Sequence, residues 1–152
     1  MKKVVFAILS ALVLCACESK MGPQEPLGKT VNISVSSSQW TYTNFQDGKF
    51  NNYFFSRWDM PELTVNVFKG GNVQGYIYLQ ENGVLIQHDL PYVLHKEIID
   101  AQGNQYIYTT TIDFVYGVGW VQFELRDSDF DYETYETIVN PEAMDFRIVM
   151  TY

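Results

Sequence analysis

Cysteine is nearly absent from this sequence. The 152 residues contain two, Cys15 and Cys17, and both lie close to the amino end. Beyond residue 17 the chain therefore has no disulfide, no thiolate metal site and no cysteine nucleophile. Packing must stabilise whatever fold follows, and the three Trp, eleven Tyr and ten Phe residues are the obvious source of it.

Basic residues are also scarce. Lys and Arg number ten against eighteen Asp and Glu, which gives a net charge of −8 at pH 7. Nucleic acids and anionic lipid surfaces attract proteins through clustered Lys and Arg side chains. The composition therefore disfavours both as partners.

Long apolar runs are limited to one segment near the start. Residues 4–14 follow Lys2 and Lys3 and span eleven residues, too few to cross ~30 Å of hydrocarbon. A basic start, an apolar middle and a small residue at a cleavage point form the layout of a bacterial secretion signal. We therefore expect residues 1–16 to be a signal peptide that is removed.

The last four residues of this leader, Leu14-Cys15-Ala16-Cys17, resemble the lipobox of bacterial lipoproteins. The resemblance implies cleavage before Cys17, followed by lipidation of Cys17 with acyl chains such as palmitate, which hold the protein on the membrane. The alternative is a plain secretion signal that leaves Cys17 as a free thiol. Glu18 is not the Asp that marks inner-membrane retention, so the resemblance favours the outer membrane and leaves the periplasmic or surface orientation open.

The mature chain is predicted to have a tether and one domain. Residues 17–29 contain Gly and Pro among polar residues without periodicity, which is typical of a flexible tether. Residues 30–152 are long enough for a single domain with its own core. Loss of Lys2 and Lys3 with the leader changes the net charge from −8 to −10.

From residue 30 onward apolar and polar residues alternate, and turn residues recur at short intervals. Val31, Ile33 and Val35 show this period of two, which predicts a half-buried strand. Asn82-Gly83 is a hairpin-turn sequence, and residues 63–67 alternate in the same way. We expect eight or nine strands and no convincing helix. The pattern predicts an all-β, antiparallel two-sheet β-sandwich, immunoglobulin-like or related, with a closed β-barrel as the alternative.

Several short motifs run through most of residues 30–152. They are Ser38-Gln39-Trp40, Met60-Pro61-Glu62-Leu63-Thr64, Leu90-Pro91-Tyr92, Gly117-Val118-Gly119-Trp120 and Phe146-Arg147-Ile148-Val149-Met150. Together with the leader they resemble small outer-membrane lipoproteins of unknown function from Bacteroidetes. The resemblance implies a β-sandwich at the outer membrane. None of these motifs is a catalytic signature, so no functional residue is transferred.

An acidic segment is the strongest candidate for metal binding. Its alternate side chains carry oxygens that suit a hard cation such as calcium: Asp127, Asp129, Asp131 and Glu133. An EF-hand is excluded, because Tyr132 replaces the required Gly and Ile138 replaces the bidentate Glu. Another kind of calcium loop is a weak alternative to a solvated acidic loop. We expect no resident metal and no cofactor.

Catalytic patterns are not evident. His88 and His95 lie seven residues apart across Pro91, without the close spacing that would fix a zinc site. No Gly-x-Ser-x-Gly sequence occurs. Pairs of carboxylates for glycoside hydrolysis cannot be judged from the sequence, because their separation is three-dimensional. The chain is therefore predicted not to be an enzyme.

Tyrosines on the predicted strands are the main candidates for ligand binding. Tyr76 and Tyr78 lie on the polar face of their strand, and Tyr106 and Tyr108 share a face of theirs. If exposed, such rings stack on sugars or on a protein partner; the alternative is packing in the core or at its rim. Core positions are expected for the tryptophans, Trp40, Trp58 and Trp120.

The sequence thus predicts a lipid-anchored protein of the cell envelope with a non-catalytic binding or accessory role. One form of this prediction is a glycan- or ligand-binding module that uses exposed tyrosines. The other is an envelope assembly protein that contacts a partner protein through an edge strand. The expected partners are the membrane, through the anchor, and a glycan or an envelope protein.

Overall fold

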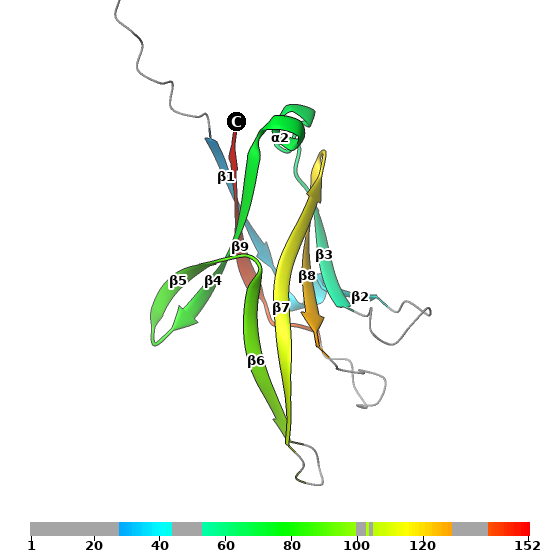
Figure 1. The fold of residues 1–152 in the computed structure, drawn as a ribbon, viewed down its shortest axis with the longest axis vertical. Coiled ribbons are helices and arrows are strands. Elements are labelled where there is room, and N and C mark those ends of the chain that lie inside the picture. Colours follow the sequence, from blue (N-terminus) through cyan, green and yellow to red (C-terminus); the bar gives the residue numbers. More distant parts are fainter. Residues whose placement is uncertain (1–27, 44–52, 100–102, 104, 129–139) are drawn as a thin grey trace, which may run out of the picture.

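The chain folds into two antiparallel β-sheets in the computed structural model (Figure 1). The structure describes residues 28–43, 53–99, 103, 105–128 and 140–152, except the side chains of Ile98 and Tyr106. The strands are β1 (Gly28–Val35), β2 (Thr41–Thr43), β3 (Tyr53–Asp59), β4 (Asn72–Glu81), β5 (Val84–Asp89), β6 (Tyr92–Ile99), β7 (Gln105–Gly117), β8 (Trp120–Asp127) and β9 (Met144–Thr151). Two short helices accompany them, the 3-10 helix η1 (Ser37–Gln39) and α2 (Val65–Gly70).

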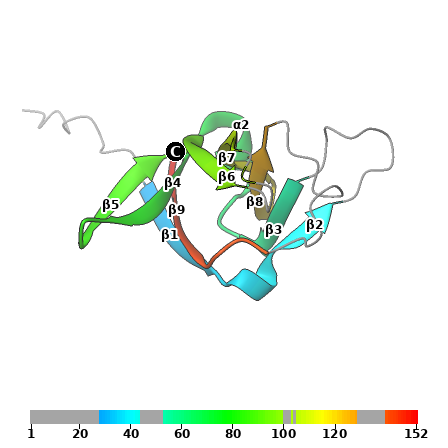
Figure 2. The ribbon, with the colours of Figure 1, turned by 90° about the horizontal axis from the view of Figure 1, so that it is seen from below.

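Sheet A has the strand order β1-β9-β4-β5, and sheet B has the order β2-β3-β8-β7-β6. Every pairing is antiparallel. Figure 2 shows the strands of sheet A gathered on one side and β8, β3 and β2 on the other. The prediction of an all-β two-sheet sandwich is confirmed. The sheets are not closed, so the barrel alternative is wrong.

The core lies between the sheets and is mainly aliphatic and aromatic. Phe123 of β8 and Phe146 of β9 are both fully buried, and their rings stack across the sheets with centroids 3.9 Å apart. Trp40 is 4% exposed and meets Phe146 edge-on at 6.3 Å, while its indole Nε1 donates to the carbonyl of Glu142 at 3.2 Å. Trp40 is therefore a core anchor, as predicted.

Residues 63–67 lead into the helix α2 and do not form the expected strand. The hydroxyl of Thr64 caps α2 by accepting a hydrogen bond from the N–H of Val67 at 3.4 Å. Leu63 and Val67 are buried at 0% and 2% exposure, whereas Val65 is 48% exposed. The buried residues are four apart, which is the helical spacing. Five residues of alternating pattern were too few to distinguish a strand from a helix.

The hairpin turn that the sequence indicated is present in the structure. Asn82 and Gly83 have φ values of 51° and 80°, the left-handed pair that a tight hairpin between β4 and β5 requires. Gly117 and Gly119 flank the reversal from β7 to β8. β1 begins at Gly28, two residues before residue 30, where the domain was expected to begin.

Candidate ligand-binding site

The outer face of sheet A is polar and carries two tyrosines. Successive side chains of a strand point to opposite faces, so the residues between the buried ones of β1, β9 and β4 face away from the core. The strand register sets these outward residues in two adjoining rows. The first row is Asn32, Arg147, Tyr76 and Asp89, and the second is Ser34, Asp145, Tyr78 and Gln87.

A hollow of about 310 Å³ opens on this face. Its lining consists of Asn32, Ile33, Ser34, Tyr78, Leu85, Asp145 and Phe146. Ile33 and Phe146 belong to the core and are buried. The hollow therefore offers a ligand an amide, two hydroxyls and a carboxylate, together with the ring of Tyr78 and the exposed aliphatic side chain of Leu85.

Hydrogen bonds between strands hold the polar groups of this face in place. Ser34 Oγ donates to Asp145 Oδ1 at 2.5 Å, which fixes the carboxylate between β1 and β9. Arg147 Nη1 donates to Gln87 Oε1 at 3.1 Å and so reaches from β9 across β4 to β5. Arg147 Nε is shielded from solvent and has no hydrogen-bond partner among the described residues. The face is thus largely pre-organised, with one unsatisfied donor in the row beside the hollow.

The four tyrosines selected from the sequence do not form one platform. Tyr76 and Tyr78 belong to sheet A, whereas Tyr106 and Tyr108 belong to β7 of sheet B. Among the three of them whose side chains the structure describes, Tyr78 alone lines the hollow; the hydroxyl of Tyr76 donates to Gln74 Oε1 at 3.1 Å. The side chain of Tyr106 lies outside the described residues.

Tyr108 has the surroundings of a packed residue. Its position on β7 has the same parity as the buried Thr110 and Ile112, so it shares the core-facing side of that strand. Burial raises the pKa of the Tyr108 hydroxyl, and the nearby charge of Asp127 raises it further. This agrees with rim packing, the alternative that the sequence left open.

Of the acidic candidates for calcium, only Asp127 is among the described residues. Its carboxylate accepts a hydrogen bond from the hydroxyl of the buried Thr110 at 2.5 Å. Asp129, Asp131 and Glu133 lie outside the described residues. Within the part of the chain that the structure describes, no group of three or more His, Cys, Asp or Glu side chains is placed to hold a metal ion.

The two histidines belong to different sheets and have separate partners. His88 on β5 contacts Glu81 Oε1 at 2.9 Å and packs against the ring of Tyr92 at 4.7 Å. His95 on β6 lies 3.3 Å from the hydroxyl of Thr109 through Nδ1. The fold therefore does not bring the two imidazoles together as a pair of ligands.

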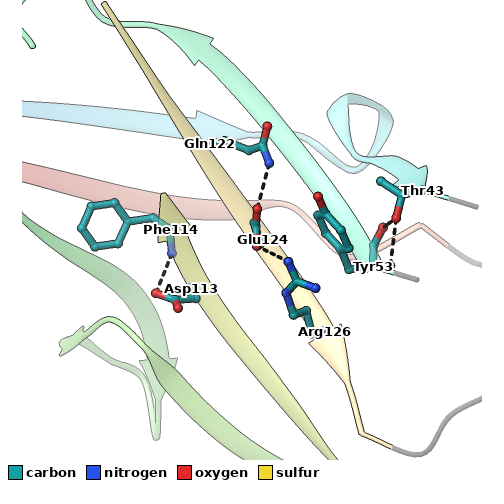
Figure 3. A network of polar contacts seen from close by, with 7 residues as sticks. All are labelled: Thr43, Tyr53, Asp113, Phe114, Gln122, Glu124 and Arg126. Carbon is teal, nitrogen blue, oxygen red and sulfur yellow. Dashed lines mark hydrogen bonds and ion pairs between the residues drawn. The ribbon is translucent and has the colours of Figure 1, made fainter. Parts of the chain in front are cut away.

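The outer face of sheet B carries a second polar arrangement (Figure 3). Glu124 is only 7% exposed and accepts hydrogen bonds from Gln122 Nε2 at 2.8 Å and Arg126 Nη2 at 2.6 Å. The guanidinium of Arg126 also lies 3.9 Å from the ring centroid of Tyr53. These groups satisfy one another, so the network stabilises the face and leaves the Tyr53 ring covered on that side.

Trp120 lies on this outer face, and the prediction that it is a core anchor is wrong. Its neighbours Val121 and Phe123 are buried, and alternation turns Trp120 outward. The indole is packed between Arg57, whose guanidinium carbon lies 3.9 Å from the ring centroid, and Gly117. The indole is therefore packed against its neighbours on this face. Trp58 is half-buried against the core and donates through Nε1 to Ser56 Oγ at 2.9 Å.

Sequence reasoning did not single out Asn32, Ser34 and Asp145 as site residues. Asn32 and Ser34 were recognisable as the outward positions of the first strand. Their partner Asp145 follows 111 residues after Ser34, and only the pairing of β1 with β9 places it beside them. No local pattern in the sequence contains that information.

Comparison of the chain with protein-family models, with curated proteins and with solved structures finds no match. No helix among the described residues is long and apolar enough to cross a membrane.

Proposed function

We propose that the mature chain is a lipid-anchored protein of the outer membrane that binds a glycan without chemically changing it. Lipidation of Cys17 would supply the anchor, as the resemblance of the leader to a lipobox implies. The hollow on sheet A would supply the binding site. The observation that carries the binding proposal is the grouping of Tyr78, Asn32 and Asp145 around one hollow.

This grouping suits a polyhydroxylated ring. The C–H face of a sugar packs on an aromatic ring such as that of Tyr78, which provides apolar contact and a polar hydroxyl tip. Asp145 accepts hydrogen bonds from hydroxyl groups, and the amide of Asn32 both donates and accepts them. The volume of about 310 Å³ lies at the small end of ligand sites, roughly 300–1,000 Å³. A single sugar unit would be held, and the open mouth would let a glycan continue.

The same lining supports a role in binding rather than hydrolysis. Glycoside hydrolysis ordinarily requires two carboxyl groups on either side of the scissile bond. Among the residues that line the hollow, Asp145 is the only carboxylate. Asp145 is also held by the hydroxyl of Ser34, an arrangement suited to a fixed hydrogen-bond acceptor.

Glycan-array binding followed by calorimetry tests the proposed site. Tyr78→Ala and Asp145→Asn should each weaken binding by about fivefold or more, because a buried polar contact or a stacked ring contributes roughly 1–3 kcal/mol. Tyr76→Ala is the matched control, since Tyr76 lies on the same strand and face but does not line the hollow. Equal losses in the three variants, or binding that none of them changes, would reject the site.

The anchor has its own test. Cys17→Ala should release the protein from membranes into the soluble fraction, because acyl chains contribute ~0.8 kcal/mol per buried methylene to membrane attachment. Mass spectrometry of the wild-type protein should show acyl groups on an amino-terminal Cys17. Unchanged membrane partitioning of the variant would contradict the anchor without bearing on the hollow.

A second candidate function is assembly with another envelope protein through β6. This strand is an edge of sheet B, and exposed edges pair with strands of other chains. Val93 and Ile99 on β6 and the neighbouring Ile107 are 51%, 65% and 73% exposed. Co-purification of one envelope protein that is lost on Val93→Lys with Ile99→Lys, but kept on Tyr78→Ala, would favour this function over glycan binding.

A further inference from the structure

The first strand, β1, begins at one particular end of the sandwich. Gly28, the first residue of β1, pairs with Thr151 near the end of β9, and Thr151 pairs with Asn72 at the start of β4. α2 ends at Gly70, two residues before Asn72. Figure 1 shows the start of β1, the carboxyl end and α2 at this same end. We call it the tether end.

The turn between β7 and β8 is held at the tether end as well. The N–H of Met60 donates to the carbonyl of Gly119 at 2.8 Å, and the N–H of Gly119 donates to the carbonyl of Leu63 at 2.8 Å. These bonds join the β7–β8 turn to the segment that leads into α2. Phe68 of α2 also meets the ring of Tyr116 edge-on at 6.0 Å.

Large apolar side chains at the tether end face solvent. Val65 and Phe68 on α2, Val118 on the β7–β8 turn and Tyr152 after β9 are 48%, 48%, 48% and 56% exposed. Met60, Leu63 and Val67 beneath them are buried, at 1%, 0% and 2% exposure. The core is thus already closed here, and the four outer side chains leave about half of their surface exposed to solvent.

The charged side chains of the tether end do not oppose contact with lipid headgroups. Lys29 Nζ lies 3.1 Å from Glu62 Oε1, so these two charges offset each other. Lys69 follows Phe68 in the last turn of α2 and is exposed, and Asp59 at the end of β3 is exposed too. The formal charges of these two residues also offset each other. A Lys beside exposed apolar residues is a combination that settles at a membrane interface.

The covalent chain keeps the tether end near any membrane that holds Cys17. Cys17 precedes Gly28 by eleven residues, and a fully extended chain of that length reaches at most about 40 Å. A tethered surface experiences a high effective concentration of its target, so even a weak contact is populated. No other part of the described domain has a shorter connection to the anchor.

We propose that the tether end, formed by Val65, Phe68, Val118 and Tyr152, rests on the bilayer surface. The proposal depends on the lipidation of Cys17 proposed above. Binding is interfacial and apolar rather than electrostatic, so the acidic net charge does not exclude it. The strands then project from the membrane, and the hollow on the flank of sheet A remains open to solvent.

Depth-dependent fluorescence quenching tests the docking on the full, processed chain in vesicles of phosphatidylethanolamine with a minority of phosphatidylglycerol. Val118→Cys places a labelled thiol at the tether end, and Val84→Cys places one at the far tip of the β4–β5 hairpin, where Val84 is 60% exposed. A quencher dissolved in the lipid should reduce the signal at position 118 several-fold more than at position 84.

Two double variants test whether the stronger quenching at position 118 depends on the apolar side chains of α2. Val65→Asp with Phe68→Asp, added to Val118→Cys, should abolish the stronger quenching while the protein stays bound to vesicles through its acyl chains. Val84→Asp with Leu85→Asp, also added to Val118→Cys, is the matched control at the far end. It should leave the quenching at position 118 unchanged. Equal quenching at positions 118 and 84 in vesicle-bound protein would overturn the docking and leave the anchor intact. A processed chain whose mass shows no acyl group would overturn the anchor, and the docking with it.

Discussion

Gly75 of β4 lies directly against the ring of Phe114 of β7. A Cβ atom at position 75 would stand 2.5 Å from Cε1 and 2.6 Å from Cδ1 of that ring, a distance that real Cβ contacts do not reach. Gly75 is buried, and Phe114 is packed against the core. The two sheets therefore approach this closely only because residue 75 has no side chain.

Gly75→Ala is consequently expected to destabilise the protein. Inserting a methyl group into a filled site forces the ring or the backbone to move, which costs typically 1–3 kcal/mol. The free energy of unfolding from urea titration measures the loss. Gly70→Ala is the control, because nothing lies within 4 Å of its added Cβ, and it should be neutral or slightly stabilising. Similar stability of the two variants would show that the sheets are less tightly packed than this contact implies.

Arg126 and Arg57 should differ in their contribution to stability, although each guanidinium carbon lies 3.9 Å from an aromatic ring centroid. Arg126 also pairs with the buried Glu124. Arg126→Ala leaves that carboxylate without its cation and should cost roughly 1–3 kcal/mol, whereas Arg57→Ala should cost about 0.5–1 kcal/mol. Urea unfolding compares them, and Arg126→Lys tests the geometry, because a Lys does not reproduce the planar stack. Equal losses for the two alanine variants would mean that the Glu124 pair contributes nothing.

The ion pair at the tether end should make stability depend on pH in the acidic range. The pKa of Glu62 is lowered below the ordinary 4.5, first by a hydrogen bond from the backbone at Glu62 and then by Lys29. A lowered folded-state pKa contributes stability above the unfolded value, and this contribution is lost as pH falls through the folded pKa. Glu62→Gln should therefore be less stable than wild type at neutral pH, by under about 1 kcal/mol for so exposed a pair.

The difference between wild type and Glu62→Gln should shrink as the pH falls below 4.5. Unfolding titrations at neutral and acidic pH measure it. Lys29→Gln should remove only part of the effect at neutral pH, because the backbone hydrogen bond to Glu62 remains. A difference that is constant across this pH range would show that the carboxylate charge is not its origin.

Much of the local structure could be predicted from the sequence. The alternation of Val31, Ile33 and Val35 correctly indicated a strand, and Asn82-Gly83 correctly indicated a hairpin turn. Both signals arise within a few neighbouring residues, since alternation and turn preference depend on backbone geometry alone. For the same reason the two-sheet class of the fold could be predicted from the sequence.

The errors share one physical cause. Residues 63–67 alternate like a strand, yet Leu63 and Val67 are both drawn into the core and the segment turns helical. Trp120 looked like a core residue by its type, but the register of β8 places Val121 and Phe123 inward and turns the indole outside. In each case packing between distant segments decided which face is buried, and local pattern did not.

The sequence alone determined the strand-rich character of the domain, the hairpin turn at Asn82-Gly83 and the acidic composition. Only the tertiary structure decided that β1 pairs with β9 and β9 with β4, which brings Ser34, Asp145 and Tyr78 into one row. It also decided which apolar side chains close the tether end and which face solvent. Alternation is a property of each strand by itself, whereas the choice of neighbouring strands depends on the packing of the whole core.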